Sequence, residues 1–221
     1  MKLLVLALGL MLSSYQASPT ENQKIEMTNE RDILKAVQEN NIDAVTKALK
    51  NGENVNATDS HKRSLLLIAT NNKNVEIAKL LVKYGADVNQ QADNLDSPFL
   101  YAGASGQTEL LKLFLANGAR FDIFNRYNGS ALIPACERGH IETVRLLANT
   151  KGFPVNHVNR LGWTGLMEAI VLGDGTKKYQ EIVKILKDAG AKMDIPDHDG
   201  VTPLQHAERA GYREIAKIIK S

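Results

Sequence analysis

The chain has only one cysteine and almost no net charge. Its single thiol, Cys136, can form no disulfide within the chain and cannot supply a cysteine-rich zinc site. Its 27 Lys and Arg residues are balanced by 25 Asp and Glu residues, for a net charge of +2. This balance gives no basic field of the kind that nonspecific binding to a phosphate backbone needs, so nucleic acid is not an expected partner. With 43% hydrophobic residues, the composition is that of an ordinary globular protein whose stability comes from packing.

Long apolar runs are missing outside the first residues. There, one positive charge precedes an apolar stretch from Leu3 to Leu12, which predicts a secretory signal peptide over residues 1–17. A membrane anchor is the weaker interpretation, because spanning a bilayer takes about 20 apolar residues. A lipid anchor is not expected, because Tyr15 stands where a bacterial lipoprotein signal requires cysteine.

The segment that follows the predicted signal is also poor in apolar residues. Residues 18–27 are polar and aperiodic, which predicts a flexible leader. We therefore expect a chain that is exported to the periplasm or the extracellular space and has no membrane span once the signal is removed.

The rest of the sequence is periodic. The aligned pairs are Ile68-Ala69, Tyr101-Ala102, Pro134-Ala135, Glu168-Ala169 and His206-Ala207, whose alanines lie 33, 33, 34 and 38 residues apart. A second marker, represented by Gly85 to Asn89, keeps the same interval. Between the markers, apolar residues recur at helical spacing, as at Leu110, Leu111 and Phe114. This period predicts a repeat protein in which each unit is a pair of helices.

The markers resemble those of a known family. Residues 197–207 are similar to the opening turn and the T-P-L-H-x-A signature of ankyrin repeats, and Gly85 to Asn89 resembles the closing turn. Lys62 and Leu95 depart from the pattern, since they replace the opening glycine. The resemblance covers residues 28–221 and implies an all-α solenoid of about six helix-turn-helix units with short β-turn tips. The expected units are 28–58, 59–91, 92–124, 125–158, 159–196 and 197–221.

Several local roles follow from this register. Glycines that end the first helix of a unit are expected at positive φ, namely Gly106, Gly139, Gly173 and Gly211. Hydroxyl residues that precede the first helices are expected to cap them, namely Ser64, Ser97, Ser130, Thr164 and Thr202. Cys136 is interpreted as a small buried hydrophobe.

No catalytic, metal or cofactor site is predicted. The histidines lack the His-Glu-x-x-His spacing of a zinc helix, and residues 173–178 lack the glycine spacing of a phosphate-binding loop. Residues 173–179 are interpreted instead as an insertion from which Tyr179 projects. The alternatives to a binding protein are a weak hydrolase or small-ligand-binding protein that uses this insertion, and an envelope-associated structural protein.

Binding to a protein is the function that the resemblance implies, through the concave face and the turn tips. Tyr127, Arg160 and Trp163 are the candidate anchors, because Tyr, Arg and Trp are the types most enriched among binding hot spots. The surrounding candidates are Arg126, Arg138 and Leu161. The competing interpretation of Trp163 is that it covers adjacent units. We expect a monomeric, non-catalytic scaffold with an inhibitor, immunity or accessory role.

Overall fold

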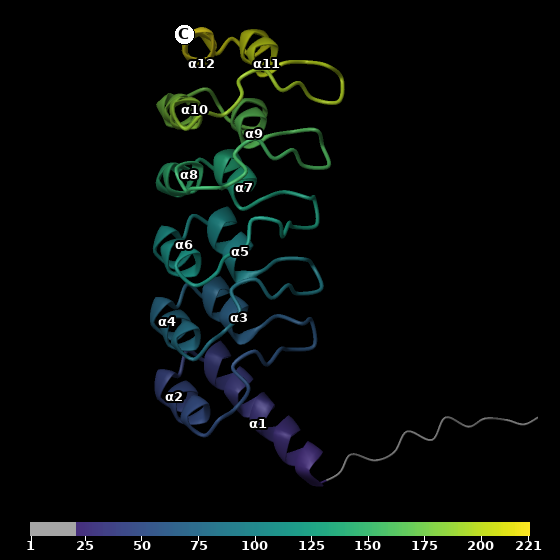
Figure 1. The fold of residues 1–221 in the computed structure, drawn as a ribbon, viewed down its shortest axis with the longest axis vertical. Helices are drawn as coiled ribbons and strands as arrows, with labels where there is room; N and C mark the ends of the chain where they lie inside the picture. Colours follow the sequence, from purple (N-terminus) through teal and green to yellow (C-terminus); the bar gives the residue numbers. More distant parts are fainter. Residues whose placement is uncertain (1–20) are drawn as a thin grey trace, which may run out of the picture.

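The computed structural model describes residues 21–221, which form twelve α-helices in six consecutive pairs (Figure 1). This part of the chain contains no β-strand, only an isolated bridge between Thr58 and Ser64. The predicted all-α class is therefore confirmed. The pairs are α1 (Glu21–Gln38) with α2 (Ile42–Lys50), α3 (Leu65–Asn71) with α4 (Val75–Lys83), α5 (Pro98–Ala104) with α6 (Thr108–Leu115), α7 (Leu132–Glu137) with α8 (Ile141–Ala148), α9 (Gly165–Val171) with α10 (Lys177–Asp188), and α11 (Pro203–Arg209) with α12 (Arg213–Lys220).

The pairs stack into a solenoid with two columns of helices (Figure 1). The first helices of the pairs form one column, which we call the inner column, and the second helices form the outer column. The loops that join consecutive pairs project beside the inner column. Their ends are the turn tips, residues 59–63, 92–96, 125–129, 159–163 and 197–201. In every tip the N–H of the first residue donates to the carbonyl oxygen of the fifth, over 2.9 to 3.1 Å.

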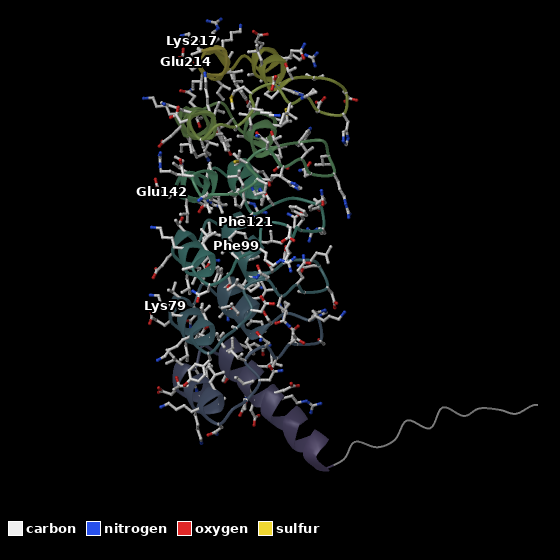
Figure 2. All side chains as sticks on the ribbon, viewed as in Figure 1. Lys79, Phe99, Phe121, Glu142, Glu214 and Lys217 are labelled. Carbon is white, nitrogen blue, oxygen red and sulfur yellow. The ribbon has the colours of Figure 1, made fainter. Side chains whose placement is uncertain are left out.

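Small residues in the inner column let neighbouring pairs approach closely. The aligned alanines Ala69, Ala102, Ala135, Ala169 and Ala207 are all completely buried. At Gly103 of α5, an added Cβ would lie only 2.7 Å from the Cβ of Ala131 in the next unit. Aromatic rings also pack together, since Phe99 of α5 and Phe121 have ring centroids 6.2 Å apart (Figure 2). A larger side chain at the aligned positions would therefore overpack the stack.

Asparagine side chains add polar links between units. The Oδ1 atom of Asn56 accepts a hydrogen bond from the N–H of Asp87 at 2.9 Å. Asn89 makes the equivalent contact with the N–H of Arg120, also at 2.9 Å. These residues belong to the second sequence marker, so its physical role is to hold the closing turn of one unit to that of the next.

Four of the five predicted helix caps are confirmed. The side-chain oxygens of Ser64, Ser97, Thr164 and Thr202 each accept a hydrogen bond from a backbone N–H in the first turn of the following helix. The prediction was wrong for Ser130. Ala131, which replaces the usual proline, is itself helical in its backbone angles, so α7 begins later, at Leu132. The buried Ser130 Oγ has no hydrogen-bond partner among the described residues.

The amino-terminal end differs from the expected leader. Helix α1 begins at Glu21, so residues 21–27 are helical although they were expected to be a flexible leader. Glu, Gln, Lys and Met, which are good helix formers, make up most of this stretch and continue into the buried helix that contains Ile33 and Val37. The predicted signal peptide, residues 1–17, lies outside the described residues. Among residues 21–221, no helix has the length and apolar character needed to cross a membrane.

The chain reversals within pairs use positive φ, as predicted, at Gly106, Gly139 and Gly211. The fifth pair differs, because the inserted residues move the positive φ to Gly175. Gly173 is required for another reason, since an added Cβ there would lie 2.1 Å from the carbonyl oxygen of Ala169. In the second pair the reversal is made by Lys73, at a φ of 56°.

Substitution of Lys73 by glycine is expected to stabilise the protein. The left-handed conformation costs an L-residue about 1–2 kcal/mol, and the greater freedom of glycine in the unfolded chain returns about 0.5–1 kcal/mol of this. We expect Lys73→Gly to raise the free energy of unfolding by about 0.5–1 kcal/mol in urea denaturation. Lys73→Ala, which removes the side chain and keeps the strain, is the control and should give no gain.

Candidate functional site

A pocket of about 410 Å³ lies between the inner column and three turn tips. Helices α5, α7 and α9 form one side, and the tips 92–96, 125–129 and 159–163 form the other (Figure 1). Three consecutive units therefore contribute to it. Its lining residues are Asp96, Tyr101, Ala104, Asn125, Arg126, Tyr127, Gly129, Ile133, Pro134, Glu137, Arg138, Asn159, Leu161, Glu168 and Leu172.

Asparagine side chains shape two of these tips. The Oδ1 atom of Asn125 accepts hydrogen bonds from the N–H groups of Tyr127 and Gly129, at 2.9 and 2.8 Å. Asn159 Oδ1 holds Leu161 and Trp163 in the same way, at 2.9 and 3.1 Å. Because each tip is tied by four hydrogen bonds among its own residues, Tyr127 and Leu161 are presented on a rigid loop.

Four of the six residues predicted from sequence line this pocket. They are Arg126, Tyr127, Arg138 and Leu161. The Arg126 guanidinium carbon lies 4.9 Å from the centre of the Tyr127 ring, a cation–π contact. Arg138 reaches the preceding unit, where its Nη1 donates to the carbonyl oxygen of Ala104 at 2.6 Å.

The other two predicted residues lie beside the pocket. Arg160 bridges two tips, since its backbone N–H donates to the Tyr127 carbonyl oxygen and its Nη1 donates to that of Arg126, both at 2.9 Å. Trp163 is partly buried and is not among the lining residues. Its backbone N–H and carbonyl oxygen both bond to Asn159.

Among the lining residues that sequence reasoning did not predict, Glu168 on α9 is the one that is both charged and buried. Only 6% of its surface is exposed, and its Oε1 accepts a hydrogen bond from Asn159 Nδ2 at 2.8 Å. The equivalent positions of the two preceding units hold Tyr101 and Pro134, which also line the pocket. The signal in the sequence was a carboxylate directly before an aligned, buried alanine.

In the next unit, the residues equivalent to Asn159 and Glu168 also contact each other, with donor and acceptor exchanged. There, His206 Nε2 lies 2.7 Å from Asp197 Oδ2. The tip residue thus donates to the helix residue in the Asn159–Glu168 pair and accepts from it in the Asp197–His206 pair.

Burial governs the acid–base properties of the pocket. Burial and the negative charge of Glu137 raise the pKa of Glu168 to about 7, against the opposing effects of the Asn159 hydrogen bond and the positive charge of Arg138. Burial also raises the pKa of Asp96 above its ordinary value, although Arg126 and Arg138 oppose this. Glu168 therefore changes its protonation state near neutral pH, where an exposed glutamate is already ionised.

Cys136 lies behind the pocket and is completely buried. Burial, assisted by the charge of Glu168, raises the pKa of its thiol well above the ordinary value. The thiol therefore stays protonated, as expected of a buried hydrophobe, and offers no thiolate nucleophile. Among residues 21–221, no three His, Cys, Asp or Glu side chains gather to hold a metal ion.

Tyr179, at the end of the predicted insertion, does not project from the stack. Tyr179 is buried, and its hydroxyl donates to the carbonyl oxygen of Glu137 at 2.7 Å. The Tyr212 hydroxyl donates to the carbonyl oxygen of Gly173 at 3.0 Å. The expectation of an exposed Tyr179 was wrong, because the ring fills the extra space that the longer turn creates between neighbouring units.

Comparison with models of protein families shows the family of this chain. A model of ankyrin repeats in three copies matches residues 12–92, 33–126 and 99–197. The chain belongs to the ankyrin-repeat family. Ankyrin repeats generally mediate interactions between proteins and are not enzymes themselves.

Solved ankyrin-repeat structures agree over most of the chain. An ankyrin repeat domain from Acinetobacter baumannii AYE is 46% identical, with a TM-score of 0.83 over 85% of this chain and 95% of that chain. The ankyrin repeat protein EF0377 is 40% identical, with a TM-score of 0.83 over 86% of this chain and 96% of that one. Both confirm the ankyrin solenoid.

Curated relatives match over shorter stretches. The ankyrin repeat protein YahD of Escherichia coli K12 is 47% identical over 95 residues, which is 42% of this chain and 47% of YahD. A glycerophosphocholine phosphodiesterase of Candida albicans is 32% identical over 98 residues, 44% of this chain and 8% of that protein. The matches thus span less than half the length of these relatives.

Replacement of Glu168 by glutamine tests whether burial in the pocket raises the pKa of this carboxyl group. The folded pKa of about 7 exceeds the ordinary value of 4.5, so between these values the folded chain holds a proton that the unfolded chain has lost. The free energy of unfolding should therefore fall as the pH rises from about 5 to about 7. Glu168→Gln should remove this fall and be about 2 kcal/mol more stable than the wild type at about pH 8.

Urea denaturation across this pH range measures the effect. Glu142→Gln, which changes an exposed carboxylate on α8 in the outer column (Figure 2), is the matched control. An unchanged pH dependence in Glu168→Gln would contradict the assignment.

Proposed function

We propose that the chain is a non-catalytic scaffold that binds a protein partner through this pocket and the turn tips beside it. The observation that carries the proposal is a pocket built by three consecutive units and bordered by apolar side chains that the stack leaves uncovered. Tyr127, Leu161 and Leu172 are 52%, 51% and 50% exposed. Exposed apolar groups around a concave site favour a binding surface.

The composition of the surface supports a protein as the partner. Tyr and Arg are enriched at binding hot spots, and Arg126, Tyr127 and Arg138 all line the pocket. The tips that carry them are tied internally, so little conformational freedom would be lost on binding. Arg160 and Trp163, which adjoin these tips, complete the proposed surface.

Export and assembly state are further parts of the proposal. The charged and apolar beginning of the chain supports a signal peptide over residues 1–17 and thus a periplasmic or secreted location. We propose a monomer with an inhibitor, immunity or accessory role and no affinity for nucleic acid, in keeping with the near-zero net charge.

The alternatives have less support. At residues 173–179, where a hydrolase or small-ligand site was the alternative, the aromatic side chain Tyr179 is buried and Tyr212 contacts Gly173, so neither tyrosine is left free to bind a ligand there. An envelope-associated structural role would show as cofractionation with the envelope, without release of a specific protein partner.

Truncation of Tyr127 should abolish much of the binding. The tagged chain, used to capture proteins from the envelope or secreted fraction of its own cells, should recover one dominant partner. Tyr127→Ala should weaken that complex by about 2 kcal/mol or more in calorimetry, since an anchor loses its buried area. The matched control is Tyr84→Ala, which removes a tyrosine that is 38% exposed at the end of α4. Equal binding by both variants would rule out the proposed surface.

Trp163 is tested by comparing binding with stability. If it is an anchor, as proposed, Trp163→Ala weakens the complex by about 2 kcal/mol and leaves the melting temperature nearly unchanged. A large loss of melting temperature with unchanged affinity would instead assign Trp163 to packing between units.

A further inference from the structure

The acidic groups that line the pocket have no ion-pair partner among the described residues. Glu168, Glu137 and Asp96 all line the pocket, and none of them forms an ion pair within 4.0 Å among residues 21–221. Among the described residues, the Glu168 side chain accepts a hydrogen bond only from Asn159, whose side chain is neutral. A buried carboxylate without a cation beside it is costly, so a cation brought by a ligand would be stabilised there.

The nearby arginines act on these carboxyl groups only at a distance, because their direct contacts lie elsewhere. Arg138 donates to the Ala104 carbonyl oxygen, and the Arg126 guanidinium lies over the Tyr127 ring. Both side chains are exposed at the rim, whereas Glu168 is almost completely buried. The pocket is therefore anionic at its floor and cationic at its rim.

The walls between floor and rim are apolar. Tyr101 and Tyr127 contribute ring surface, and Leu161 and Leu172 contribute exposed aliphatic surface. A lysine or arginine side chain matches this arrangement, because its long apolar stem packs against such walls while its charged end seeks an anion.

We propose that the pocket receives a lysine or arginine side chain of the protein partner, whose cation lies beside the Glu168 carboxylate while its stem packs between Tyr127 and Leu161. The inference deepens the proposed function and rests on it. An acidic side chain fits less well, because at the floor it would meet Glu137 and Glu168. Acidic neighbours of the inserted residue would instead face Arg126 and Arg138 at the rim.

The proposal implies a pH dependence. Glu168 must be ionised to pair with the cation. The charged groups that act on it are Glu137, the last residue of α7, and Arg138, which follows it, while Asp96 and Arg126 also line the pocket. Because the pKa of Glu168 is about 7, affinity should rise between about pH 6 and about pH 8.

Random peptides displayed on phage are the probe for the test. Panning against the immobilised chain at about pH 8 is expected to enrich sequences with a lysine or arginine next to an apolar residue. In fluorescence anisotropy with a selected synthetic peptide, Glu168→Gln should weaken binding about tenfold or more. Exchange of the peptide's cationic residue for methionine should have a similar effect, with little further loss when both changes are combined.

Controls separate this inference from the proposed function. Glu142→Gln on the outer column should bind the peptide as the wild type does. Full affinity in Glu168→Gln, together with loss in Tyr127→Ala, would overturn the cation pocket and keep the binding surface. Enrichment of acidic or uncharged peptides, or of none, would also overturn the cation pocket. Native-partner binding that is indifferent to Tyr127→Ala would instead remove the proposed function itself.

Discussion

The contact between neighbouring units is the constraint on which the rest of the structure depends. A single pair of short helices cannot bury its apolar face alone, and in a solenoid each pair is stabilised by the pairs beside it. The buried alanines and Gly103 set how closely the inner helices approach. That approach fixes the spacing of the turn tips, because each tip enters its helix directly. The pocket exists because three units are held at this spacing, and no single unit contains it.

The periodic sequence was sufficient to predict this architecture. Equal spacing of two independent markers requires a repeated unit, and four of the five hydroxyl residues make the predicted capping hydrogen bond. The failures occurred where one unit departs from the others. Ala131 continues the helical backbone angles where proline would have fixed the start of α7, and Ser130 therefore does not cap. Inserted residues moved the reversal from Gly173 to Gly175 and buried Tyr179.

The candidate binding surface could likewise be predicted in part from the sequence. Arg126, Tyr127 and Leu161 occupy tip positions whose exposure follows from the register, and the structure brings them to one pocket. Glu168 could not be identified in this way, because its environment is made by residues of its own unit and of the preceding one. From the sequence, a carboxylate at this position is expected to be exposed to solvent. Its burial becomes evident only when α7 and the tip that contains Asn159 are placed around it. Sequence periodicity thus specifies which positions face outward, whereas depth and electrostatic environment need the assembled stack.

The paired polar residues at the base of the tips also limit how this sequence can vary. In the fifth unit Asn159 donates to Glu168, and in the sixth Asp197 lies against His206. An aspartate at 159 would place two carboxylates in contact. It would still accept the hydrogen bonds from the N–H groups of Leu161 and Trp163, because aspartate keeps the side-chain oxygen that Asn159 uses for them. The obstacle to aspartate is therefore the partner nine residues later. Related sequences should show these two positions changing together, with a donor at one whenever the other is acidic.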